Sequence, residues 1–95
     1  MIYSLKRLKK FDKDYRRELR NNQKATFRDD LIAVLNDLAA GKPLPKRMFD
    51  HALSGEFKGS RECHVYPDLL LIYCVREDSG EIVLARLGSH AQLGL

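Results

Sequence analysis

Residues 69–76 read Leu-Leu-Leu-Ile-Tyr-Cys-Val-Arg, and this run decides the fold. It is apolar at successive positions, so both faces of an extended strand would be buried, as in a central strand. Glu77-Asp78-Ser79-Gly80 follows as a hairpin turn, and Ile82–Gly88 is the next strand. Upstream, Arg61–Tyr66 alternates between apolar and polar residues and ends at the turn Pro67-Asp68. We therefore expect three consecutive antiparallel strands.

Two amphipathic helices are expected before these strands. Apolar residues recur at steps of three and four from Leu5 to Leu19, and Asn21-Asn22 ends this first helix. The second begins with the capping-box pattern Thr26-x-x-Asp29 and stops at Gly41 and Pro43. The predicted apolar stripes are Leu5, Leu8, Phe11, Tyr15 and Leu19, and then Phe27, Leu31, Val34, Leu35 and Leu38.

The remaining segments complete the expected order of elements. Ile2–Leu5 predicts a short opening strand, Lys42–Gly59 an irregular loop that contains His51, and His90–Leu93 a short C-terminal helical turn. The order β-α-α-β-β-β predicts an α+β fold in which an antiparallel sheet packs on an αα-hairpin. We expect residues 1–95 to form a single domain, because two would each be too small to bury a core.

Composition indicates a globular cytoplasmic protein. The chain is 44% hydrophobic and 32% charged, which excludes a disordered protein. Its longest apolar run, Leu69–Val75, is far shorter than the roughly 20 residues that cross a bilayer. Lys6 and Arg7 leave no room for the apolar core of a signal sequence. Cys63 and Cys74 fit no metal-binding spacing and are interpreted as small buried hydrophobes in a reducing compartment.

Charge is distributed unevenly along the chain. Residues 1–50 hold thirteen Lys/Arg and seven Asp/Glu, a net +6, whereas residues 51–95 hold four and six, a net −2. A basic N-terminal half indicates a surface that binds a polyanion. The alternative is that these charged side chains only keep a helix face solvated. The candidate RNA- or ribosome-binding residues are Lys9, Lys10, Lys13, Arg16 and Arg17.

All three histidines, at positions 51, 64 and 90, lie in the other half. An imidazole changes charge near neutral pH, so two or three can supply a proton acceptor and a proton donor. An arginine such as Arg86 can hold the charge that builds on a phosphate. His51, His64, Asp68, Arg86 and His90 therefore form a candidate site for cutting RNA without a metal.

Strand geometry favours their convergence. Glu62 and His64 share a face of one strand, Asp68 follows at the turn, and Arg86 is expected on the face of Ile82 and Leu84. If that face points away from the helices, these groups gather in an open groove near His51 and His90. Each residue also has a structural interpretation: His51 and His64 as surface residues, Asp68 in its turn, Arg86 paired with Glu62 or Glu81, and His90 as a cap.

The chain resembles the YafQ-like branch of the RelE/ParE toxin superfamily over nearly its whole length. The matching motifs are Asp50-His51-x-Leu53-x-Gly55, Lys58-Gly59-x-Arg61, His64-Val65-x-Pro67-Asp68, Leu71-Ile72-Tyr73 and Arg86-x-Gly88-x-His90. The resemblance implies a RelE-like fold and a type II toxin–antitoxin toxin that cleaves mRNA in the ribosomal A site. It also implies a cognate antitoxin as partner. From the residues themselves we expect no membrane, metal or cofactor.

By motif position, the resemblance makes His51, His64, Asp68, Arg86 and His90 the functional residues. In such a reaction a ribose 2′-OH attacks the adjacent phosphorus. His90 is the expected acid and His51 or His64 the base; Asp68 orients an imidazole or shares the base role, and Arg86 holds the phosphoryl oxygens. Two positions depart from the family: Leu69 stands where relatives can carry Trp, and Gly94 stands near the place of a base-stacking aromatic.

Three alternatives remain open. The three histidines and Asp68 could bind zinc, although the chain has no HExxH or similar close pair. A non-catalytic toxin similar to the ParE toxins would have the same fold without needing several ionisable residues in one groove. A plain RNA- or protein-binding module would use the basic helix alone.

Overall fold

The computed structural model describes residues 3–21 and 24–95. Its elements are β1 (Ser4–Arg7), α1 (Lys9–Asn21), α2 (Phe27–Ala39), the 3-10 turn η1 (Lys46–Met48), β2 (His51–Ala52), the 3-10 turn η2 (Gly55–Phe57), β3 (Arg61–Tyr66), β4 (Leu69–Arg76), β5 (Glu81–Gly88) and α3 (His90–Leu93). Within those ranges, no helix has the length and apolar character needed to cross a membrane.

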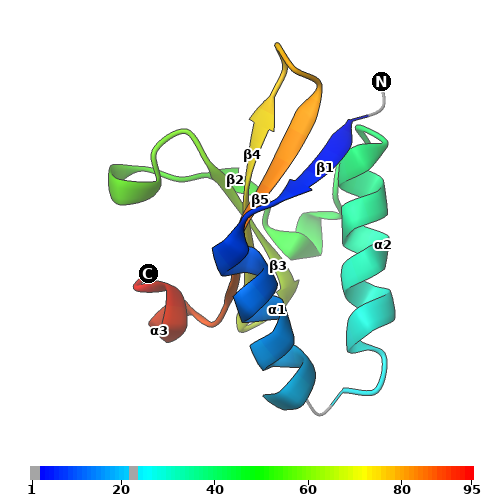
Figure 1. Ribbon diagram of the computed structural model, residues 1–95, viewed down its shortest axis with the longest axis vertical. Helices are drawn as coiled ribbons and strands as arrows, with labels where there is room; N and C mark the ends of the chain where they lie inside the picture. Colours follow the sequence, from blue (N-terminus) through cyan, green and yellow to red (C-terminus); the bar gives the residue numbers. More distant parts are fainter. Residues whose placement is uncertain (1–2, 22–23) are drawn as a thin grey trace.

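Five strands form one sheet in the order β1-β5-β4-β3-β2. β1 runs parallel to β5, and the other neighbouring pairs are antiparallel. Figure 1 shows α1 and α2 on one side of the sheet, with α3 and the segment around η2 on the other. The α+β fold expected from the sequence is confirmed, with β2 as an additional short strand.

β4 is buried on both faces, as its sequence predicts. Leu71 and Tyr73 pack into the larger core, which the two long helices cover. Leu70 and Ile72 point the other way and form a smaller core with Leu93 of α3. Because an apolar strand face must be covered, the second face requires α3 and the residues before η2 to fold back over the sheet.

The predicted bounds of Arg61–Tyr66, Leu69–Arg76 and His90–Leu93 are confirmed, and β5 starts one residue earlier than expected. The opening strand is Ser4–Arg7 instead of Ile2–Leu5, of which Ile2 lies outside the described residues. The expectation that His51 lies in a loop is wrong, because it forms β2 and pairs with Glu62 of β3.

The second helix has its predicted apolar stripe. Phe27, Leu31, Val34 and Leu38 are buried, and Leu35 is half-buried against them. The capping box at Thr26 is wrong: its side chain makes no cap hydrogen bond, and its Oγ1 donates to Asp30 Oδ2 at 3.0 Å. Gly41 follows the helix end with φ +71°, a left-handed conformation that suits glycine.

The first helix differs most from expectation. Leu5 belongs to β1, and strand pairing continues to Leu8, whose N–H donates to Leu84 O at 3.0 Å. Leu8 and Leu19 are exposed, so only Phe11 and Tyr15 of the predicted stripe face the core. Two carboxylates are buried instead, those of Asp14 and Glu18.

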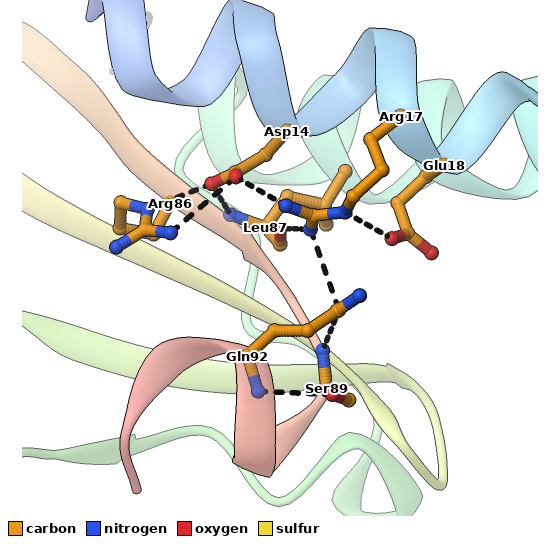
Figure 2. Close-up of polar contacts among 7 residues, drawn as sticks. All are labelled: Asp14, Arg17, Glu18, Arg86, Leu87, Ser89 and Gln92. Atoms are coloured by element: carbon orange, nitrogen blue, oxygen red, sulfur yellow. Dashed lines mark hydrogen bonds and ion pairs between the residues drawn. The ribbon is translucent and has the colours of Figure 1, made fainter.

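Asp14 is buried because it completes the edge of β5 where β1 has ended. β1 pairs with β5 only as far as Leu84. Beyond that point, Leu87 N–H donates to Asp14 Oδ2 at 3.0 Å and Leu87 O accepts from Arg17 Nη2 at 2.8 Å. Two side chains of α1 thus replace the missing strand (Figure 2). The backbone N–H and C=O groups at this edge of β5 are therefore hydrogen-bonded without another strand.

Three groups hold Asp14 in its charged form. Besides Leu87 N–H, Arg86 Nε donates to Oδ2 at 2.7 Å and Arg17 Nη1 donates to Oδ1 at 2.8 Å. Burial opposes ionisation of this carboxyl, but the hydrogen bonds from Arg86, Leu87 and Arg17 together outweigh it and lower its pKa.

The same cluster links α1 to the C-terminal helix. Arg17 Nη2 reaches Gln92 Oε1 of α3 at 3.3 Å (Figure 2). Gly88 of β5 belongs to this packing, because a Cβ at its position would lie 2.8 Å from Arg17 Nη2 and 2.9 Å from Gln92 Oε1. Close approach, and not an unusual φ angle, accounts for glycine there. Asp14 therefore influences the position of α3 through two side chains.

We predict that Asp14→Asn lowers the free energy of unfolding by about 2 kcal/mol at neutral pH, because charged hydrogen bonds at a buried site are lost. Since the folded-state pKa of Asp14 is lowered, its stabilisation is complete above the unfolded-state pKa and disappears as pH falls through the folded value. The gap between wild type and variant should therefore close in acid, as measured by urea unfolding over a pH series.

The matched control is Asp12→Asn on the same helix. Asp12 pairs with Arg7 at 3.5 Å, but that arginine is largely exposed, so the loss should be below about 1 kcal/mol. Equal losses for the two variants would contradict a special role of Asp14.

Candidate functional site

The candidate site lies on the sheet face opposite α1 and α2. Directly paired residues of antiparallel strands share a face, and Glu62 pairs with Ile72 while His64 pairs with Leu70. Those two β4 residues belong to the smaller core, which also contains Leu93 and, at its margin, Leu53 and Phe57. This apolar floor fixes the polar side chains of β3 that stand beside it.

Glu62 is the buried centre of the site, only 5% exposed. Its Oε2 lies 3.0 Å from His51 Nε2, and His51 Nδ1 lies 2.7 Å from the carbonyl oxygen of Phe49. Both ring nitrogens of His51 thus face oxygen atoms, and the carbonyl can only accept a hydrogen bond. His51 therefore has no free ring nitrogen for another task.

The second oxygen of Glu62 points toward His64. Glu62 Oε1 lies 4.0 Å from His64 Nε2, too far for a hydrogen bond. Among the described residues it is a buried oxygen without a hydrogen-bond donor. Burial of an oxygen without a hydrogen-bond donor raises the free energy of the folded state, so a proton or a cation beside this atom would be stabilising.

His90 is held at the start of α3 by two devices. Ser89 and Gln92 form a capping box: Ser89 Oγ accepts from Gln92 N, and Gln92 Oε1 accepts from Ser89 N. Asp68 Oδ1 lies 3.0 Å from His90 Nδ1, and its hydrogen bond to this ring lowers the pKa of Asp68. With Nδ1 on Asp68, Nε2 of the half-exposed His90 ring is left to act on a ligand.

The two outer histidines face each other. The ring centroids of His64 and His90 are 5.7 Å apart, with the rings inclined at 67°. Each has a carboxylate beside it, Glu62 for His64 and Asp68 for His90. Of the five residues predicted from the sequence, the structure brings four into one connected cluster, His51, His64, Asp68 and His90.

Arg86 is the residue that the structure places differently. Ile72 pairs with Arg86 but Tyr73 pairs with Leu84, so Ala85 is an extra residue in a β-bulge. The bulge turns Arg86 to the face of Ile72, and the expectation that it shares the face of Ile82 and Leu84 is wrong. Its ion-pair partner is Asp14, neither Glu62 nor Glu81, and its guanidinium lies at the sheet edge (Figure 2).

A basic groove of about 490 Å³ begins at this edge; Lys10, Lys13, Asp14, Arg17, Arg20 and Arg86 line it. Lys10 and Lys13 are exposed here, as expected for residues that bind a polyanion. Arg17 is partly buried and bonded to Asp14, Glu18 and Leu87, so its first role is structural. Lys9 and Arg16 are exposed on α1 but do not line this groove.

Two further residues of the site have only weak signals in the sequence. The alternating sequence of β3 predicts that Glu62 faces solvent. In the structure the short strand β2 covers this side chain. Phe49 is 63% exposed, with a left-handed φ of +46°. Its ring is tilted against that of His51, with centroids 4.5 Å apart, and lies edge-on to His64 at 5.9 Å. It offers an aromatic surface beside the histidines on which a nucleobase could stack.

Comparison with known proteins identifies the family. The family model described as "Bacterial toxin of type II toxin-antitoxin system, YafQ" matches residues 3–94. This chain belongs to the YafQ toxin family. Curated YafQ relatives from Haemophilus influenzae and Escherichia coli K12 are 41% and 43% identical over the matched segments, which cover 67% and 54% of this chain. Those segments span 65% and 53% of the relatives' own length, and the E. coli protein is named an mRNA interferase toxin.

Solved structures agree over the whole YafQ fold. A metal-bound toxin from Helicobacter pylori is 39% identical with a TM-score of 0.85, and the match covers 98% of this chain and 99% of that one. YafQ in the E. coli DinJ–YafQ toxin–antitoxin complex is 28% identical with a TM-score of 0.84, covering 98% of each chain.

The buried pair of Glu62 and His51 generates a stability prediction. His51→Ala leaves Glu62 Oε2 without its partner, so the free energy of unfolding should fall by about 1–3 kcal/mol. In a Glu62→Gln background the same change should cost less, with a coupling energy of about 0.5–3 kcal/mol. Urea unfolding of the four proteins gives this coupling; additive losses would show that the two side chains do not act together.

Proposed function

We propose that this YafQ-family chain is the toxin of a type II toxin–antitoxin system, an endoribonuclease that cleaves mRNA on the ribosome. Family membership and the activity in the E. coli relative's name support this proposal. The observation that carries the mechanism is the pair of facing imidazoles, His64 and His90, each with a carboxylate behind it. No metal or cofactor is required in this proposal, because the pair can supply both proton transfers.

His64 is the proposed base. Its Nε2 takes the proton of the ribose 2′-OH while that oxygen attacks phosphorus, and the nearby Glu62 carboxylate stabilises the imidazolium that forms. The sequence left His51 and His64 open as the base. His51 is the weaker candidate, because its two ring nitrogens already contact Phe49 O and Glu62 Oε2. His51 instead orients Glu62.

His90 is the proposed acid. In its charged form, Nε2–H gives a proton to the leaving 5′-oxygen as the P–O5′ bond breaks, and the products are a 2′,3′-cyclic phosphate and a 5′-hydroxyl. Asp68 fixes the ring through Nδ1 and stabilises the imidazolium before the transfer. The requirement for a 2′-OH explains why RNA and not DNA is the substrate.

Arg86 is proposed to hold the phosphoryl oxygens. It stands on the same sheet face as Glu62, two strands away, so the backbones are about 10 Å apart. Its bonds to Asp14 use Nε and Nη2. Nη1 makes no contact with Asp14 and stays available to a phosphoryl oxygen.

The partners are proposed on the same basis. A cognate antitoxin is inferred from the family and from the E. coli complex with DinJ. The ribosome and its mRNA follow from the proposed activity, and the basic groove beside Arg86 suits their phosphates. A cytoplasmic location is proposed together with this target.

The catalytic proposal predicts that His64→Gln and His90→Gln each slow mRNA cleavage by about 10²–10⁴-fold while ribosome binding persists. It also predicts that one 2′-deoxynucleotide on the 5′ side of the scissile phosphate blocks cleavage there. Purified protein with translating ribosomes, followed by mass spectrometry of the fragment ends, measures both effects.

The same assay separates the rival functions. Toxin that has been treated with a chelator and then freed of it should still cleave at the Mg²⁺ concentration that ribosomes need, and dependence on added zinc or copper would overturn the metal-free mechanism. Growth inhibition that survives the His64→Gln/His90→Gln double substitution would favour a non-catalytic toxin similar to the ParE toxins or a simple binding module.

Binding to the ribosome should depend on the basic groove. Lys10→Glu with Lys13→Glu should weaken ribosome affinity and reduce the slope of log affinity against log salt by about one for each phosphate that the protein no longer binds. The control is Lys42→Glu with Arg76→Glu, which changes the net charge equally at exposed positions outside the groove. Equal effects of the two pairs would assign binding to overall charge.

A further inference from the structure

Phe49 is an unexpected residue for its position. It is the most exposed of the large hydrophobic side chains in the described part of the chain, and the only aromatic one among them. It directly follows η1, and its φ of +46° lies in the left-handed region that side chains of this size rarely adopt. A glycine would fit this backbone without strain. Burial and backbone geometry therefore do not explain a phenylalanine here, and a functional reason is indicated.

The ring of Phe49 is fixed beside the proposed base. Its centroid lies 4.5 Å from that of His51 and 5.9 Å from that of His64, to which it is inclined at 75°. His51 is itself held in place, because Nδ1 lies 2.7 Å from Phe49 O and Nε2 lies 3.0 Å from Glu62 Oε2. His51 thus supports one side of the Phe49 ring, and the exposed remainder is open to a ligand next to His64.

A groove of about 480 Å³ adjoins the same histidine; Arg47, His64, Val65, Tyr66 and Pro67 line it. Arg47 is an exposed residue of η1, two positions before Phe49, and brings a positive charge to the groove. The described residues that line it include no carboxylate, and neither Arg86 nor His90 is among them. The groove therefore approaches the histidine pair from the side of His64. An aromatic ring and an arginine together suit a nucleotide, whose base can stack and whose phosphate can pair.

The proposed chemistry decides which nucleotide this is. His64 takes the proton of the attacking 2′-OH, so the ribose on the 5′ side of the scissile phosphate lies against this ring. His90 gives its proton to the leaving oxygen, which belongs to the next nucleotide. The base on the first ribose therefore lies on the His64 side of the pair, where Phe49 is exposed. The phosphate that precedes this ribose lies toward Arg47.

We propose that Phe49 and Arg47 form the subsite for the nucleotide that supplies the attacking 2′-OH. Its base stacks on the exposed ring of Phe49, and its own 5′-phosphate pairs with Arg47. This inference rests on the proposed function and deepens it. Stacking fixes the ribose in front of His64 and thereby orients the 2′-OH for attack. Because every base has a face that can stack, the subsite favours strongly stacking bases without selecting a single one.

The test compares two synthetic mRNAs bound to ribosomes. One is intact, and the other has an abasic ribonucleotide, which keeps its 2′-OH, directly 5′ of the mapped scissile phosphate. The wild type should cleave the abasic mRNA about 5–150-fold more slowly, the factor that one base stacked on an aromatic ring is worth. Phe49→Ala should slow cleavage of the intact mRNA by a similar factor and cleave the abasic mRNA as fast as the wild type does.

A structural role of Phe49 gives a different result. If Phe49 only supported His51 and His64, Phe49→Ala would slow cleavage of both mRNAs equally, and this outcome overturns the proposal. Full-rate cleavage of the abasic mRNA by the wild type also overturns it. An abasic nucleotide on the 3′ side should leave the effect of Phe49→Ala unchanged. Disappearance of the effect there, and not on the 5′ side, would assign the ring to the leaving nucleotide and overturn the proposal.

Other substitutions at Phe49 separate stacking from stability. Phe49→Gly relieves the left-handed backbone, so its midpoint of urea unfolding should exceed that of Phe49→Ala. Both variants should nevertheless cleave the intact mRNA equally slowly, whereas cleavage that follows stability would contradict stacking. Phe49→Tyr keeps an aromatic ring and should cleave like the wild type. The matched control is Ile32→Ala, which removes an exposed apolar side chain of α2 and should leave both rates unchanged.

Arg47 and the activity itself complete the test. Arg47→Gln should slow cleavage of the intact and the abasic mRNA by the same factor, because this side chain is proposed to contact a phosphate and not the base. An effect of Arg47→Gln confined to the intact mRNA would overturn that assignment. A wild type that cleaves no ribosome-bound mRNA would reject the proposed function, and the subsite with it. Normal cleavage without coupling between Phe49 and the 5′ base would reject the subsite alone.

Discussion

Both faces of β4 exclude water, and this constraint organises the molecule around one sheet. The two long helices cover one face and leave the other to short pieces of chain, α3 and the segment around η2 (Figure 1). Leu93 fills the second core, and His90, three residues earlier, is thereby set opposite His64. The position of His90 thus depends in part on apolar burial, because the packing of Leu93 on Leu70 and Ile72 holds α3 against the sheet.

Local periodicity predicts those features that burial alone dictates. The strand run at 69–76, the alternation at 61–66 and the stripe of α2 are confirmed for this reason. The first helix is harder to predict, since its buried face contains Asp14 and Glu18, whose partners come from β5 and from α1 itself. Hydrophobic periodicity cannot reveal a carboxylate that is buried in order to complete a strand edge.

The same limit applies to the site. Three histidines and Asp68 can be proposed from residue type and the family resemblance, and they do converge. Simple alternation assigns Arg86 to the wrong face because a one-residue bulge at Ala85 reverses it, and nothing in the local sequence requires that bulge. The covering of Glu62 by β2 is equally hidden, because two residues are too few to give a strand pattern.

Arg86 connects the basic groove with the sheet face that contains the histidines. Strand register places it in one row with Ile72 and Glu62, on the face of the histidines, while Asp14 draws its guanidinium toward the basic groove. In the proposed function it is thus the positive charge shared by the groove that would bind RNA and the cluster that would cleave it. The histidine cluster itself has two carboxylates, Glu62 and Asp68, and attracts a polyanion poorly. Under the proposed function, an RNA strand would therefore be held from the groove side, where Lys10 and Lys13 line the groove together with Arg86.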